Sequence, residues 1–121
     1  MRLLNAFYTI LLISICSCAY ENREDEVQKN QLCEPLNMSF SENIKPILNS
    51  NCVSCHNINI ANGGVNLQEF AQVKKLADNG KLVGVINHSP GFAFMPQGAA
   101  KLPECEILKI ETWINEGAQN N

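Results

Sequence analysis

The chain has 121 residues, of which 45% are hydrophobic and 17% are charged, a composition that suits one globular domain and leaves little for a second. The formal net charge of −3 supplies no basic stripe, which excludes nucleic acid and an anionic membrane surface as electrostatically recruited partners. Six cysteines in so short a chain indicate disulfides, metal ions or covalent cofactors, and the compartment decides among these.

The N-terminal residues predict export. Arg2 is followed by an apolar run from Leu3 to Ile15. This run is well short of the ~20 residues that a membrane-spanning helix needs, so it favours a signal peptide over a retained transmembrane anchor. We assign residues 1–17 to the signal peptide.

The sequence Ile15-Cys16-Ser17-Cys18 resembles the lipobox of bacterial lipoproteins, in which a small residue precedes a cysteine that is acylated and becomes the new N-terminus. Ser17 makes Cys18 the better candidate, because Cys16 would follow the bulky Ile15. We therefore expect a lipoprotein anchored by acyl chains to a membrane, on the periplasmic side or at the cell surface. Residues 18–32 would form the lipidated N-terminus and a flexible tether, since they are mostly polar.

Residues 33–121 are predicted to be the folded part, with apolar residues at helical spacing almost throughout. The first helix should run into Cys52, with Ser41 as its capping candidate and Pro46 in its first turn. A second helix should begin at Leu67, where apolar residues recur every three positions as far as Leu76, and should end at Asn79-Gly80.

Two further helices complete the predicted fold. A brief one covers Leu82 to Ile86, and the last one has Pro103 at its first helical position and stops at Gly117. The apolar stripe of this last helix consists of Ile107, Ile110, Trp113 and Ile114. We expect an all-α domain of three to four short helices. Because small domains bury their surface poorly, something besides these side chains should fill its centre.

The sequence Cys52-Val53-Ser54-Cys55-His56 matches the haem attachment pattern of c-type cytochromes. Cysteines three residues apart lie on one side of a helical turn, so their sulfurs can reach both vinyl groups at one porphyrin edge. The residue after the second sulfur then points beneath the ring, where the imidazole of His56 can coordinate iron as the proximal ligand. Export agrees with this, because such attachment takes place outside the cytoplasm. We expect one covalent haem c.

Two other sites could use the same five residues. A thioredoxin-like redox pair is expected at the end of a strand in a βαβ pattern, and the sequence shows no such pattern. A structural zinc site would need further cysteines or histidines at matched spacing, and His88 is the only other histidine. Both alternatives therefore fit the sequence less well than haem attachment.

The sixth iron ligand is predicted to be Met95, in a segment rich in proline and glycine, residues 90–98. Such a segment can present the thioether in a single geometry. Three alternatives stay open: Met95 fills a gap in the core, His88 ligates the iron instead, or the sixth position is vacant, which would permit ligand sensing or peroxidase chemistry. Met38 is expected to pack beside Phe40.

From Phe40 to Ala118 the chain resembles the monohaem class I cytochromes c. The resemblance is carried by a helix that enters the CxxCH motif, a loop with Gly63-Gly64, the Met95-Pro96 pair and a C-terminal helix with Trp113-Ile114. It implies a small cytochrome c-like domain around one covalently bound haem, in which the helix before the motif and the last helix cross. It also suggests that a backbone carbonyl near the two glycines orients the haem-ligating histidine.

The implied function is one-electron transfer between donor and acceptor proteins that the sequence does not identify. No acid–base pair is evident, so we expect a carrier and not an enzyme. The alternatives are a haem-based ligand sensor or enzyme-associated module with open or bis-histidine iron, and a redox-inert lipoprotein whose cysteines form only disulfides.

The crossing of the first and last helices would bring Cys33 and Cys105 together as a disulfide, and two free buried thiols are the alternative. The haem propionates need partners as well. Candidates for that role are Lys74, Lys75, Lys101 and Trp113.

Overall fold

The structure, a computed structural model, describes residues 33–121. The predicted signal peptide, the lipidated Cys18 and the tether lie outside the described residues and stay predictions. Glu34–Asn121 forms one unit, to which the following description refers. Among the described residues, no helix combines the length and the apolar character needed to cross a membrane.

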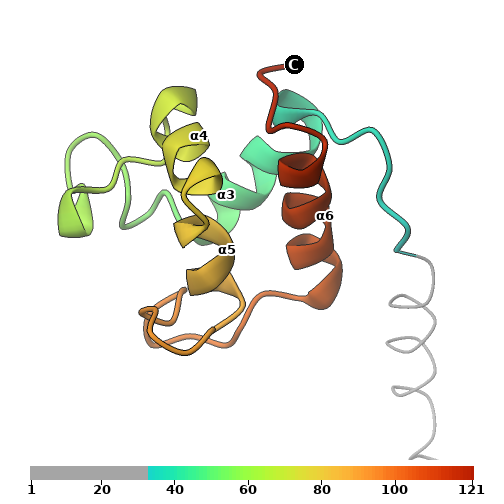
Figure 1. Cartoon of the computed structure of the whole chain (residues 1–121). Helices are drawn as coiled ribbons and strands as arrows, with labels where there is room; N and C mark the ends of the chain where they lie inside the picture. Colours follow the sequence, from blue (N-terminus) through green and yellow to red (C-terminus); the bar gives the residue numbers. More distant parts are fainter. Residues whose placement is uncertain (1–32) are drawn as a thin grey trace, which may run out of the picture. The chain divides into compact units, whose positions relative to one another are not determined.

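The described part of the chain is helical and contains no strand, which confirms the all-α prediction at that level (Figure 1). Each predicted helix has a counterpart, and long loops connect α3 to α4 and α5 to α6. In chain order the elements are η1 (Phe40–Ile44), α3 (Lys45–Asn51), η2 (Asn62–Gly64), α4 (Phe70–Asp78), α5 (Lys81–Ile86) and α6 (Glu104–Asn115).

The first helical segment begins with Ser39 as its N-cap, so the prediction of Ser41 as the cap is wrong. The Ser39 hydroxyl accepts a hydrogen bond from the Glu42 backbone N–H at 3.4 Å. The Ser41 hydroxyl donates to the Asn121 carbonyl oxygen at 2.8 Å, as that of Ser39 also does, but it accepts from no backbone N–H of the segment. Pro46 lies in the first turn of α3, as predicted.

Helix α4 starts three residues later than the apolar spacing predicts. The Leu67 backbone N–H donates to the His56 carbonyl oxygen at 2.8 Å, which commits this residue to the connection before the helix. Leu67 is buried all the same, so the apolar pattern correctly identified a core residue but not its helix.

Helix α6 begins at Glu104, with Pro103 in an extended conformation as its N-cap, so the predicted first helical position is wrong by one residue. The helix ends where predicted. Gly117 follows it with a φ of 100°, a left-handed conformation in which a side chain would be strained.

An aromatic cluster joins the two ends of the unit. Phe40 of η1 lies with its ring centroid 4.9 Å from that of Phe70 and 5.6 Å from that of Trp113 of α6. The first and last helical segments therefore pack against each other. The Trp113 ring is 1% exposed and its Nε1 donates to the Gln119 carbonyl oxygen at 2.9 Å. Trp113 has no free donor for a haem propionate, and that candidate is withdrawn.

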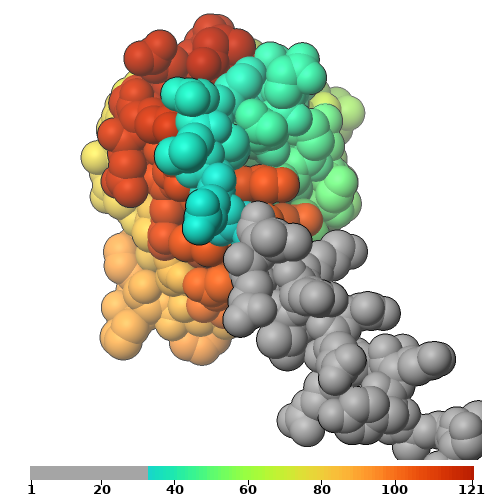
Figure 2. All heavy atoms as spheres, turned by 90° about the vertical axis from the view of Figure 1, so that its right-hand side faces the viewer, coloured from blue at the N-terminus to red at the C-terminus, as the bar shows by residue number. Residues whose placement is uncertain are grey.

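The segment that precedes η1, cyan in Figure 2, lies against α6, drawn in orange to red. The backbone N–H groups of Asn37 and Met38 both donate to the Glu116 carboxylate, at 2.8 and 2.7 Å. Met38 packs against the core, as predicted. These bonds fix the entry of the chain into its first helical segment.

Candidate functional site

The CxxCH motif forms one turn at the end of α3. Cys52 is the C-cap of that helix, and its carbonyl oxygen accepts from the backbone N–H groups of Cys55 at 3.1 Å and His56 at 3.0 Å. These two bonds close a helical turn, so the two cysteines lie about one turn apart on the same side. Both thiols are free, that of Cys52 half-buried and that of Cys55 exposed.

The other cysteines of residues 33–121 are in a different state. Cys33 and Cys105 are disulfide-bonded, and they form a pair at disulfide distance, in agreement with the predicted bond. Of the four cysteines in residues 33–121, only the two in the CxxCH motif therefore keep a thiol that can react.

The backbone of His56 is held on both sides, but its ring is not. The N–H donates to the Cys52 carbonyl oxygen, and the carbonyl oxygen accepts from Leu67. The ring Nδ1 is buried and has no hydrogen-bond partner within the described residues. The expected carbonyl from the Gly63–Gly64 loop is therefore not bonded to it. Leaving a buried polar atom without a hydrogen bond costs free energy of folding. No described residue therefore orients this ring through its Nδ1.

Asn57 joins the motif to the turn that follows. Its Nδ2 donates to the Val53 carbonyl oxygen at 2.9 Å, and its Oδ1 accepts from the N–H groups of Asn59 at 2.9 Å and Ile60 at 3.0 Å. Asn57 was not among the predicted site residues. An asparagine directly after the histidine was a usable signal, because asparagine side chains commonly bond the backbone two residues further on.

Replacing Asn57 by alanine should lower the free energy of unfolding by about 2 kcal/mol, since four hydrogen bonds are lost, one of them a long one to the Ser54 carbonyl oxygen. Urea unfolding followed by circular dichroism measures this change. Asn59→Ala is the matched control, because the Asn59 side chain is exposed and no hydrogen bond of the described residues involves it. Equal stability of the two variants would contradict the assigned role of Asn57.

The environment of Cys52 disfavours its thiolate. Burial, and secondarily the negative charge of Glu106, raise the pKa of the Cys52 thiol from 9.0 to about 11. Asn51 of α3 donates its Nδ2 to the Glu106 Oε2 at 3.1 Å, which holds this carboxylate in α6 beside the motif. The thiol therefore stays protonated at neutral pH.

In the chain with free thiols, iodoacetamide at pH 8 should alkylate Cys55 well before Cys52. The thiolate is the reacting form, and the thiolate fraction falls about ten-fold for each pH unit below the pKa. Glu106→Gln should speed the alkylation of Cys52, because removing the negative charge lowers its pKa, while Glu104→Gln serves as the control. Peptide mass spectrometry over time measures both rates. Faster alkylation of Cys52 than of Cys55 in the wild-type chain would contradict the assignment.

Met95 lies in a separate loop that is tied back to α5. Its backbone N–H donates to the Val85 carbonyl oxygen at 3.1 Å, and its own carbonyl oxygen lies 3.0 Å from the Nε2 of His88. The Met95 side chain is half-buried. The Met95–Pro96 peptide bond is cis. The structure thus places the candidate ligand in a loop with a defined backbone, and it places Cys52, Cys55 and His56 together in another segment.

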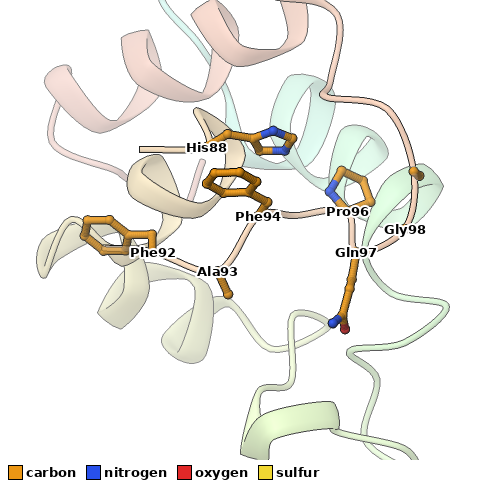
Figure 3. A pocket seen from close by; sticks show the side chains of 8 residues that line it. His88, Phe92, Ala93, Phe94, Pro96, Gln97 and Gly98 are labelled. Atoms are coloured by element: carbon orange, nitrogen blue, oxygen red, sulfur yellow. The ribbon is translucent and has the colours of Figure 1, made fainter. Parts of the chain in front are cut away.

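The same loop borders a cavity of about 510 Å³ (Figure 3). Met95 is not among its lining residues. The cavity is lined by His88, Phe92, Ala93, Phe94, Pro96, Gln97, Gly98 and Ala99. Two of these side chains are large apolar groups exposed to solvent, Phe92 at 40% and Phe94 at 56%.

A second pair of exposed apolar side chains follows the CxxCH motif. Ile58 is 68% and Ile60 is 54% exposed. Neither pair was predicted, because exposure of an apolar side chain depends on which elements cover it and has no local sequence signal. Both loops that flank the candidate ligands therefore present apolar surface.

The described residues offer no ready alternative site for a metal ion. No group of three or more His, Cys, Asp or Glu side chains is placed to hold one in residues 33–121. The zinc alternative thus lacks a complete ligand set in that part of the chain.

No known protein family, curated protein or solved structure matches this chain in comparisons of sequence and structure.

Proposed function

We propose that this protein is an exported one-electron carrier with a single haem c, bound covalently through Cys52 and Cys55 and axially through His56 and Met95. In this proposal it is a small cytochrome c-like domain, anchored to a membrane by a lipid at Cys18. It would exchange electrons with donor and acceptor proteins outside the cytoplasm and would not be an enzyme.

One observation carries the proposal: two free thiols share a helical turn with the histidine that directly follows the second of them. The buried Nδ1 of His56 without a protein partner supports it, because the ring is left available for a bound group. The residues present therefore fit a haem c.

The residues of the motif would act as follows. The thiols of Cys52 and Cys55 would hold the porphyrin through thioether bonds, each formed by addition of S–H across one vinyl double bond, with sulfur on one carbon and hydrogen on the other. The addition is redox-neutral and needs no oxidant. His56 would supply a ring nitrogen and Met95 its thioether sulfur as ligands of the iron. A haem held there would supply an iron centre that accepts and returns one electron.

The contacts of His88 favour Met95 over His88 as the sixth ligand. A carbonyl oxygen only accepts hydrogen bonds, so the Nε2 of His88 must carry a hydrogen to bond the Met95 oxygen. A ring nitrogen that carries hydrogen has no lone pair for iron, so with this bond in place His88 could ligate iron only through its Nδ1. The exposed apolar side chains beside both ligands are also suited to contact an apolar porphyrin.

The decisive experiment is expression of the full chain in a bacterium with a c-type haem maturation system. We expect a red protein in the membrane fraction, with one iron per polypeptide and a reductive titration that consumes one electron. A colourless product would overturn the proposal in favour of a disulfide-bonded lipoprotein. Ready binding of carbon monoxide by the reduced protein would instead point to an open iron and a sensor or enzyme module.

A further inference from the structure

His88 connects the end of α5 to the Met95 loop. Its Nε2 donates to the Met95 carbonyl oxygen at 3.0 Å, and its ring stacks on Phe94, with centroids 4.6 Å apart and planes 7° from parallel. Figure 3 shows these two rings facing each other beside Pro96. The imidazole is thus fixed by a ring contact and a hydrogen bond to the same loop.

The Met95 peptide groups are held at two points by neighbouring residues of one segment. The N–H donates to the Val85 carbonyl oxygen in α5, and the carbonyl oxygen accepts from the His88 ring. Both bonds are made by the peptide groups of Met95, which also carries the thioether. Motion of the backbone at this residue would therefore move the sulfur. The bond from His88 removes part of this freedom.

We propose that His88 is a positioning residue for Met95, which keeps the thioether on the iron by bonding the Met95 carbonyl oxygen. This inference rests on the proposed ligation by His56 and Met95. Sequence alone offered His88 as a competing ligand, whereas its contacts assign it a supporting role.

Three variants of His88 separate the hydrogen bond from the other properties of the ring. Phenylalanine keeps a ring against Phe94 and removes the donor. Asparagine suits the left-handed backbone of residue 88, where φ is 56°, but is too short to reach the Met95 oxygen. Glutamine carries an amide nitrogen the same number of bonds from the backbone as Nε2, so it can restore the donor.

The test titrates the oxidised holoprotein with imidazole, which must displace Met95 to bind, and follows the near-infrared methionine-to-iron band. His88→Phe and His88→Asn should lower the apparent dissociation constant for imidazole about five-fold, the effect of losing one hydrogen bond. His88→Gln should bind imidazole like the wild-type protein. If the phenylalanine variant fails to fold, the asparagine variant decides.

Two results would overturn the inference while leaving the ligation intact. One is an imidazole affinity that stays unchanged in both variants that lack the donor. The other is a glutamine variant that binds imidazole as tightly as those two variants do. Absence of the methionine band from the wild-type holoprotein would overturn the proposed ligation itself, and this inference with it.

Discussion

Replacing both Cys52 and Cys55 by alanine should leave no pigment on the polypeptide after extraction with acid acetone, while the wild-type polypeptide stays coloured. Acid protonates the axial imidazole and releases a haem held only by coordination, but it does not cleave thioether bonds. Each single alanine variant keeps one thioether and should stay coloured. Absorbance and the intact mass of the extracted chain measure attachment directly.

The matched control replaces Cys33 and Cys105 by alanine. These cysteines form the disulfide-bonded pair of the described residues and are not part of the motif. Their loss should lower the free energy of unfolding by about 4 kcal/mol, because a bond that closes so long a loop restricts the unfolded chain. Pigment should nevertheless stay attached. The extraction denatures the chain, so the assay measures covalent attachment and not stability of the fold. Pigment that survives extraction without Cys52 and Cys55 would show that the attachment site lies elsewhere.

The helices could be predicted because their signals are local. Apolar residues at three- and four-residue spacing identified the buried side chains, and the glycine after α6 takes the left-handed conformation that ends a helix. The cap of the first helical segment could not be predicted. Ser39 and Ser41 are equivalent candidates in sequence. Both hydroxyls donate to the Asn121 carbonyl oxygen, and only that of Ser39 also accepts from the Glu42 backbone N–H.

The candidate site, too, could be predicted from the sequence only in part. The turn from Cys52 to His56 is a matter of three- and four-residue spacing, so its geometry followed from the motif. The role of His88 did not, because it depends on the loop folding back onto α5 until the Met95 oxygen meets the ring. The buried, unpaired Nδ1 of His56 likewise depends on the path of the chain around it, and the resemblance to cytochromes c led to the expectation of a partner that the structure lacks.

Met95→Ala should abolish the near-infrared methionine-to-iron band and allow the reduced holoprotein to bind carbon monoxide. A ligand that must displace a bound side chain has its affinity reduced by the fraction of molecules in which the iron is free. If Met95 occupies the iron in about 99% of molecules, its removal should strengthen carbon monoxide binding about 100-fold. Optical spectra of the oxidised protein and carbon monoxide titration of the reduced protein measure the two effects.

Met38→Ala is the matched control, because Met38 packs against the core beside the first helical segment, which precedes the CxxCH motif. It should lower stability and leave both the band and the resistance to carbon monoxide unchanged. His88→Ala should also keep the band when no competing ligand is present, since a positioning residue weakens the bond without supplying it. Absence of the band from the wild-type holoprotein, together with carbon monoxide binding gained in His88→Ala but not in Met95→Ala, would make the histidine the ligand.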